Sequence, residues 1–109
     1  ELAPDASVLI SDEFQDFTRL QYEIFKIWRK NCDVTYIAGD EFQSIYLFWG
    51  SSPEFIRKEM KKGDVKILPT TYRFGDSIWD FSTKIITYKD VPEINCSGVS
   101  EPVYYTSLD

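Results

Sequence analysis

The sequence predicts an α/β fold with a mainly parallel β-sheet. Short apolar runs alternate along the chain with segments whose apolar residues recur at helical spacing, and this alternation is typical of strands that are connected by helices. The run Val8–Ile10 contains no polar residue, as in parallel strands that are buried on both faces. Hydrophobic residues make up 43% of the 109 residues, which indicates a globular chain and excludes a disordered one.

The first half of the chain is predicted to contain a strand, a helix and a second strand. The first strand covers residues 8–10 and ends before a polar Ser-Asp pair. Thr18 and Gln21 have the spacing of a capping box, which predicts a helix over about 18–30. The apolar residues of this helix recur at helical spacing: Leu20, Ile24, Ile27 and Trp28. Residues 34–38 are expected to form the second strand.

The second half is predicted to contain two more helices and two more strands. They are expected at the following positions: a helix over about 52–61, a strand at 65–68, a helix that begins at Asp76, and a last strand at 103–106. Ser52 would cap the first of these helices, and Pro53 would occupy its first turn. Asp76 would cap the second helix, whose apolar residues share one face: Ile78, Phe81, Ile85 and Ile86.

Composition and charge exclude several classes of function. The chain has no histidine, which removes histidine-based catalysis and most zinc chemistry. Cys32 and Cys96 form no CxxC pair, so neither a zinc site nor a disulfide framework is indicated. The net charge of -6 argues against nucleic-acid binding by this chain unaided. No apolar stretch reaches the roughly 18 residues of a membrane span, so we expect a cytoplasmic protein without membrane contact.

Acidic residues follow both strands of the first half. Asp12 and Glu13 come directly after the first strand, and Asp40 and Glu41 come after the second. Ligands of parallel sheets gather at the carboxyl ends of the strands. An acidic pair in this position is the arrangement with which a nucleoside triphosphatase holds magnesium and polarises water. The alternative is a solvated turn at the end of a strand, and the pair alone leaves both interpretations open.

Three ordered motifs resemble those of a known family. DEFQD at Asp12–Asp16 follows the first strand, GDEFQSIY at Gly39–Tyr46 follows the second, and TYR ends the stretch Leu68–Arg73. In this order and at this separation they resemble motifs II, III and IV of the UvrD/Rep helicases of superfamily 1. The resemblance covers about residues 6–90.

The resemblance implies a segment of an ATP-dependent DNA helicase or translocase. The fold would be a RecA-like (P-loop NTPase) partial domain. Residues 1–70 would form the C-terminal part of the first RecA-like motor domain, and residues 71–109 the start of the second. Such a motor couples ATP hydrolysis to movement on single-stranded DNA in repair, recombination or replication. The implied cofactors are ATP and Mg²⁺, the implied partners are single-stranded DNA and the remaining helicase domains, and the implied place is the cytoplasm or the nucleoid.

The resemblance also implies roles for individual residues at the nucleotide. Asp12 would hold the magnesium of MgATP through water, and Glu13, beside the metal, would be the general base for the hydrolytic water. Gln43 would contact the γ-phosphate. Arg73 would act as an arginine finger on the transferring phosphoryl group. Tyr72 would stack on the adenine.

The aromatic residues after the second motif would contact DNA. Tyr46 and Phe48 would lie near single-stranded DNA, and Trp49, where the family usually has arginine, would add a further stacking surface. The loop from Gly39 to Trp49 would then join nucleotide sensing at one end to the DNA grip at the other. The alternative is that these aromatics belong to the core or face a partner protein.

The phosphate-binding P-loop is missing from the sequence. None of the five glycines lies in the frame GxxxxGK[ST], whose backbone N–H groups and lysine hold the phosphates. We therefore expect the segment to be inactive alone and to belong to a longer protein that supplies this loop. Two other functions stay open: a non-catalytic interaction module with a helicase-derived fold, and the helicase part of a helicase-nuclease.

Overall fold

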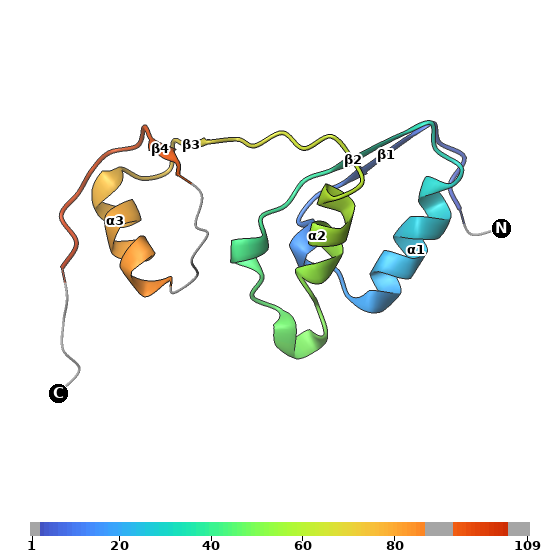
Figure 1. Ribbon diagram of the computed structural model, residues 1–109, viewed down its shortest axis with the longest axis horizontal. Coiled ribbons are helices and arrows are strands. Elements are labelled where there is room, and N and C mark those ends of the chain that lie inside the picture. The colour runs from blue at the N-terminus through green and yellow to red at the C-terminus, as the bar shows by residue number, and fades with distance from the viewer. Residues whose placement is uncertain (1–2, 87–92, 105–109) are drawn as a thin grey trace. The chain divides into compact units, whose positions relative to one another are not determined.

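The computed structural model describes residues 3–86 and 93–104, which fall into two compact units, Glu1–Val65 and Lys66–Asp109 (Figure 1). Both pair their strands in parallel, which confirms the predicted α/β class with a parallel sheet. No helix within the described residues combines the length and the hydrophobicity that crossing a membrane requires.

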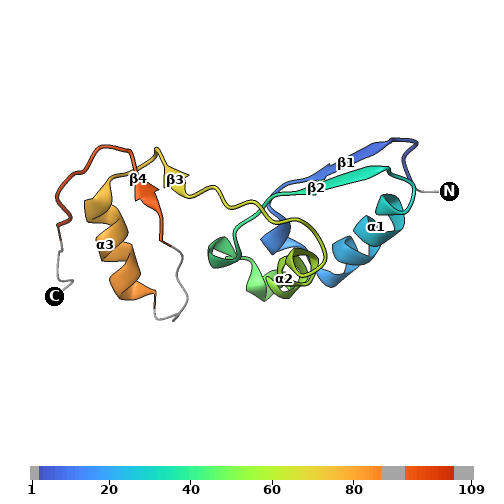
Figure 2. The same cartoon turned by 45° about the horizontal axis from the view of Figure 1, so that its top comes forward.

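The first unit is built around a parallel strand pair. Its elements in chain order are β1 (Val8–Ser11), the 3-10 turn η1 (Phe14–Asp16), α1 (Arg19–Arg29), β2 (Val34–Ile37), the 3-10 turns η2 (Glu41–Gln43) and η3 (Leu47–Trp49), and α2 (Glu54–Met60). β1 pairs with β2 from Val8 opposite Val34 to Ser11 opposite Ile37. Helices α1 and α2 lie against the same face of this sheet (Figure 2). Both strands and both helices were predicted at these places.

Among the described residues of the first unit, the sheet is covered on one face only. Leu9 and Ile37 pack against the core beneath the helices, whereas Ile10 is 73% exposed and Tyr36 is 61% exposed on the opposite face. The prediction of a strand buried on both faces is therefore wrong for β1 within this chain. The side chains on this face are apolar or aromatic: Val8, Ile10, Val34 and Tyr36.

Helix α1 begins as the capping box predicts. The Gln21 N–H donates to Thr18 Oγ1 at 3.3 Å, and the Thr18 N–H donates to Gln21 Oε1 at 2.8 Å. The two reciprocal bonds satisfy N–H groups that have no partner inside the helix. The helix buries Tyr22 and Phe25, while the apolar residues at helical spacing remain largely exposed: Leu20, Ile24 and Ile27.

The core of the first unit is aromatic. Phe14 has no exposed surface, and its ring stacks on Phe17 at a centroid distance of 4.2 Å and meets the edge of Phe25 at 4.8 Å. Tyr22 stacks on Phe55 at 4.6 Å, which joins α1 to α2. Such ring pairs add about 0.5–1.5 kcal/mol each to the energy of burial. The core thus connects η1, and with it the end of β1, to both helices.

A buried carboxylate connects the two helices on their polar side. Glu59 on α2 is 8% exposed and accepts hydrogen bonds from the Tyr22 hydroxyl at 2.6 Å, from Arg29, and from Lys62 Nζ at 3.3 Å. Burial acts to raise the pKa of Glu59, but the hydrogen bonds from Tyr22, Arg29 and Lys62 outweigh it and leave this pKa below its ordinary value. Burial and the bond to Glu59 raise the pKa of Tyr22 from 10.0 to about 12.

Replacing Tyr22 by phenylalanine should therefore destabilise the first unit. The change removes a hydrogen bond to a charged acceptor and should lower the free energy of unfolding by about 1.5–3 kcal/mol. Because the pKa of Tyr22 is higher in the folded chain, its stabilisation is present below pH 10 and is lost as the pH rises from 10.0 to about 12. Urea unfolding of the parent and of Tyr22→Phe at several pH values measures the difference in the free energy of unfolding. A difference that stays constant between pH 10 and about 12 would contradict the prediction.

The beginning of α2 differs slightly from the prediction. Pro53, and not Ser52, takes the N-cap position. The Ser52 hydroxyl oxygen, one residue before the cap, still accepts the Glu54 N–H of the first turn at 3.3 Å. The predicted helix is confirmed.

The second unit contains a shorter parallel pair and one helix among its described residues. These elements are β3 (Thr70–Thr71), α3 (Asp76–Ile85) and β4 (Asn95–Cys96). Thr70 pairs with Asn95 and Thr71 with Cys96. Gly75 takes the N-cap position of α3, so the prediction of Asp76 as the cap is wrong. Asp76 instead lies in the first turn, where its negative charge interacts favourably with the positive end of the helix dipole.

The strand predicted at 65–68 is also wrong. These residues form no strand, and the strand of this region is the later pair Thr70–Thr71. Leu68 is 89% exposed and Ile67 is 70% exposed, so within the part of the chain that the structure describes this apolar run has neither a partner strand nor a core to cover it. The last predicted strand fails where it can be tested, since Val103 and Tyr104 are not in a strand, and 105–106 lie outside the described residues.

Candidate functional site

The loops that follow β1 and β2 meet at one edge of the first unit, as the sequence predicts. The Ala38 N–H donates to the Ser11 carbonyl at 2.8 Å, and the Phe14 N–H donates to the Ala38 carbonyl at 3.0 Å. These bonds extend the contact between the two chain segments beyond the ends of the strands. The DEFQD segment and the GDEFQSIY segment therefore lie side by side.

Gln15 connects these two segments through its side chain. It is 1% exposed, and its Oε1 accepts the Asp40 N–H at 3.0 Å. Its Nε2 donates to Glu13 Oε2 at 2.7 Å and to Asp16 Oδ2 at 3.3 Å. A buried amide that is bonded on both sides fixes its neighbours, because breaking either bond would leave a polar group unsatisfied.

Asp40 continues the connection into η2. Its Oδ1 accepts the Phe42 N–H at 3.0 Å, which caps the turn, and its Oδ2 accepts Gln43 Nε2 at 2.8 Å. Gln43 is exposed, so its amide is held by the bond from Nε2 to Asp40 while the residue remains open to solvent. Glu41 pairs with Arg57 on α2, which attaches the same turn to that helix.

Asp12 and Glu13 present their carboxylates at the surface. Both residues are exposed, and Asp12 Oδ1 accepts the Glu13 N–H at 2.9 Å. The backbone of Glu13 is left-handed, with φ 51° and ψ 40°, a conformation that is uncommon for residues other than glycine. Strained backbone of this kind is concentrated at functional sites.

The aromatic residues of η3 form an exposed cluster. Phe48 and Trp49 are each 74% exposed, and Tyr46 is 41% exposed. The rings of Tyr46 and Trp49 stack at 5.9 Å, and Phe48 meets Trp49 edge-on at 5.5 Å. Gly50 ends the turn with φ 86°, and Ser51 is buried again. Three neighbouring rings thus contact one another while two of them stay largely exposed among the described residues.

Tyr72 and Arg73 belong to the second unit and follow β3. The ring of Tyr72 is 79% exposed, and Arg73 is exposed with its N–H bonded to Thr71 Oγ1 at 3.3 Å. The structure thus brings together the DEFQD and GDEFQSIY segments of the first unit, whereas Tyr72 and Arg73 belong to the second unit.

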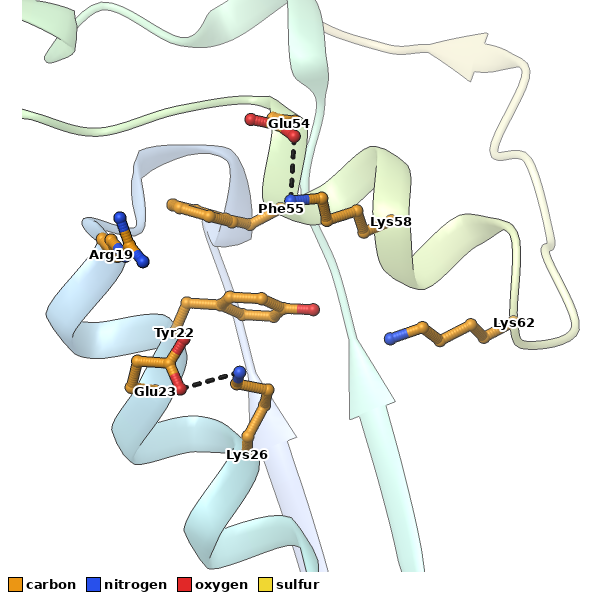
Figure 3. A pocket seen from close by; sticks show the side chains of 8 residues that line it. All are labelled: Arg19, Tyr22, Glu23, Lys26, Glu54, Phe55, Lys58 and Lys62. Carbon is orange, nitrogen blue, oxygen red and sulfur yellow. Dashed lines mark ion pairs between the residues drawn. The ribbon is translucent and has the colours of Figure 1, made fainter.

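A pocket of about 470 Å³ between α1 and α2 contains none of the predicted site residues (Figure 3). Its cationic side chains are Arg19, Lys26, Lys58 and Lys62. Lys26 pairs with Glu23 at 2.7 Å, and Lys58 pairs with Glu54 at 2.8 Å. Neighbouring acids and the rings beneath satisfy most of this charge, so helix packing accounts for the pocket.

Sequence reasoning assigned no role to Gln15 and Asp40, although both lie inside the motifs. Their importance depends on a contact between segments that are distant in sequence. The signal that was available is their residue type, since an amide or a carboxylate in a loop that packs beside the core needs hydrogen-bond partners where it is buried.

The comparisons with known proteins agree on one family. The N-terminal domain of UvrD/REP helicases matches residues 2–64. The ATP-dependent DNA helicase UvrD2 of Mycobacterium tuberculosis is 40% identical over 80 residues, covering 71% of this chain and 11% of that protein. The ATP-dependent DNA helicase Rep of Buchnera aphidicola is 45% identical over 84 residues, covering 73% and 13%. DNA helicase II of Haemophilus influenzae is 34% identical over 80 residues, covering 72% and 11%.

The chain spans between 11% and 13% of the length of these three relatives. The family match covers more than half of the chain and coincides closely with the first compact unit, residues 1–65. It includes the Gln15 connection and the exposed aromatic cluster. The chain therefore belongs to the UvrD/REP helicase family.

Proposed function

We propose that the chain is a segment of an ATP-dependent DNA helicase and couples ATP hydrolysis to movement on single-stranded DNA. The observation that carries this proposal is the hydrogen-bonded connection from Glu13 through Gln15 and Asp40 to Gln43. The chain then continues from Gln43 directly into the exposed aromatics. These bonds, together with the few residues after Gln43, thus connect a carboxylate suited to hydrolysis with rings suited to base stacking. The choice of ATP as the nucleotide and DNA as the nucleic acid is supported by the relatives that are named as ATP-dependent DNA helicases.

In this proposal the fold is RecA-like and continues in other parts of a larger protein. Residues 1–70 are the C-terminal part of the first motor domain, and residues 71–109 are the start of the second. The uncovered face of β1 and β2 supports this, because an apolar sheet face requires a covering layer. Asp16 Oδ1 is buried without a hydrogen-bond partner among the described residues. In this proposal another segment of the larger protein donates the missing hydrogen bond.

Asp12 and Glu13 fit a magnesium–nucleotide complex. Mg²⁺ is commonly held by one or two carboxylates together with substrate phosphates and water. Two exposed carboxylates on adjacent residues meet that need, although the described residues contain no group of three or more metal-binding side chains. When bound, the ion would neutralise charge on the phosphates. Asp12 would hold it through water, and Glu13 would accept the proton of the attacking water.

Nucleotide contacts are also proposed for Gln43 in the first unit and, separately, for Tyr72 and Arg73 in the second. The Gln43 amide has two N–H donors, so its bond to Asp40 leaves one for a γ-phosphate oxygen. The Arg73 guanidinium would stabilise charge on the transferring phosphoryl group. The exposed ring of Tyr72 offers a face for the adenine.

The exposed rings of Tyr46, Phe48 and Trp49 fit single-stranded DNA better than a duplex. Stacking on unpaired bases needs aromatic faces and little charge, whereas binding through phosphates needs a basic surface, which a chain of net charge -6 lacks. DNA binding by this segment would therefore depend on the rings, with the basic contacts supplied from elsewhere in the protein.

Replacing Phe48 by alanine should weaken binding to single-stranded DNA in the complete protein. Loss of one stacking surface should cost about 1–3 kcal/mol, or roughly 5- to 150-fold in Kd. Fluorescence anisotropy with a labelled oligothymidine at fixed salt measures it. Leu47→Ala is the matched control, because Leu47 lies in the same turn and is 58% exposed but has no ring. Equal losses in the two variants would contradict a stacking role.

The proposed function is tested by assaying two proteins in parallel. The complete polypeptide encoded by the gene should hydrolyse ATP faster with single-stranded DNA and should separate a DNA duplex. The 109-residue segment, which contains no GxxxxGK[ST] sequence, should do neither. A complete protein that binds partners but never hydrolyses ATP would instead be a non-catalytic interaction module. DNA cleavage alongside ATP turnover would indicate a helicase-nuclease.

A further inference from the structure

The orientation of the Gln15 amide is determined by its surroundings. Its oxygen faces an N–H donor, that of Asp40, and its nitrogen faces two carboxylate acceptors, those of Glu13 and Asp16. An amide turned end for end would place its oxygen against both carboxylates and its NH₂ group against the N–H, which loses all three bonds. With 1% of its surface exposed, Gln15 has no solvent with which to replace them. Its position therefore follows that of the Asp40 backbone.

Two residues of the following loop are adapted to this amide. Gly39 makes room for it, because a Cβ atom on Gly39 would lie 2.7 Å from Gln15 Oε1 and 3.0 Å from the Phe14 backbone nitrogen. The Ser44 hydroxyl donates to the Gln15 carbonyl oxygen at 3.3 Å, which is a second connection from the loop to η1. The loop thus holds Gln15 at its side chain and at its backbone.

We propose that Gln15 is a positioning residue that transmits the position of the Gly39–Trp49 loop to the carboxylate of Glu13. This inference rests on the proposed function. When DNA on the rings of η3 displaces the loop, the Asp40 N–H moves, and Gln15 moves with it. The bond from Gln15 Nε2 to Glu13 Oε2, 2.7 Å long, then changes the direction in which the carboxylate points. Glu13 thereby reaches its working position when DNA is bound.

The test compares Gln15→Leu with the parent in the complete protein, by ATP turnover with and without a saturating oligothymidine. Leucine keeps an apolar stem of similar size but forms none of the three bonds. Turnover with DNA should fall roughly 10- to 100-fold, as expected for a misplaced catalytic group. Turnover without DNA should fall by a smaller factor, so the stimulation ratio falls. The KM for ATP should change by less than about twofold, because Gln15 does not contact the nucleotide.

Gln21→Leu is the matched control. It also removes an amide-to-backbone hydrogen bond, that of the capping box, but it does not touch the loop, and its stimulation ratio should equal that of the parent. If Gln15→Leu does not fold, Ser44→Ala removes only the second connection and should lower the ratio partially. An unchanged ratio in a folded Gln15→Leu protein, or in Ser44→Ala when Gln15→Leu is unfolded, overturns this inference alone. Absence of ATP turnover in the parent overturns the proposed function and this inference with it.

Discussion

Replacing Glu13 by glutamine is expected to reduce DNA-stimulated ATP turnover by roughly 10²- to 10⁴-fold in the complete protein, the range attributed to general acid–base catalysis. Glutamine retains the size of the side chain but cannot accept a proton from water. Folding should be unaffected, because Glu13 is exposed and the oxygen of a glutamine there can still accept the bond from Gln15 Nε2. Steady-state phosphate release measures turnover, and binding of a fluorescent ATP analogue shows whether the site is still formed.

Glu23→Gln provides the matched control for this change. Glu23 is also exposed on the first unit, and its carboxylate pairs with Lys26 at 2.7 Å on α1, apart from the loops that follow the strands. This variant should hydrolyse ATP at the parental rate, since an exposed ion pair contributes at most about 1 kcal/mol to stability. Parental turnover in Glu13→Gln would reject Glu13 as the general base.

Replacing Phe14 by alanine is expected to produce the largest loss of stability. Phe14 has no exposed surface, and its ring contacts Phe17 and Phe25 at the centre of the core. Truncating a buried phenylalanine costs about 3–5 kcal/mol, which approaches the total stability of many small domains. Circular dichroism during thermal unfolding of the parent and the variant measures the loss.

Phe48→Ala removes the same side chain from an exposed place and controls for composition. Because Phe48 is 74% exposed, its truncation should change the free energy of unfolding by less than about 0.5 kcal/mol. The two phenylalanines thus separate the roles of the aromatic residues: Phe14 stabilises the fold, and Phe48 belongs to the proposed DNA surface. A loss below about 1 kcal/mol in Phe14→Ala would show that the aromatic core is not essential to the unit.

The elements that sequence reasoning predicts correctly are those with local signals. The start of α1 is specified by Thr18 and Gln21, whose side chains satisfy backbone groups within the same turn. The strand expected at 65–68 fails because apolar content indicates burial without specifying a partner, and β3 pairs with β4 at Thr70–Thr71 instead. The cap of α3 lies one residue from its predicted place, since Gly75 and Asp76 both carry plausible start signals.

The features of the candidate site also fall into those that the sequence predicts and those that it cannot predict. The meeting of the two motifs at one edge is predictable, because parallel strands bring their carboxyl ends together. The roles of Asp12, Glu13 and Gln43 come from family resemblance and stay predictions. The role inferred for Gln15 could not be predicted, because it depends on the space beside Gly39 and on the backbone of a distant loop. No spacing rule along the chain expresses such a contact.

The left-handed backbone at Glu13 sets the stability of the fold against the proposed catalytic role of this residue. With φ 51° and ψ 40°, the position suits glycine or asparagine, and a glutamate there costs on the order of 1–3 kcal/mol. Random mutation and selection for stability alone would replace it. If Glu13 has the proposed catalytic role, an acidic residue would be kept at this position by selection for its carboxylate. Lineages that no longer need that chemistry should be free to adopt the more stable residue.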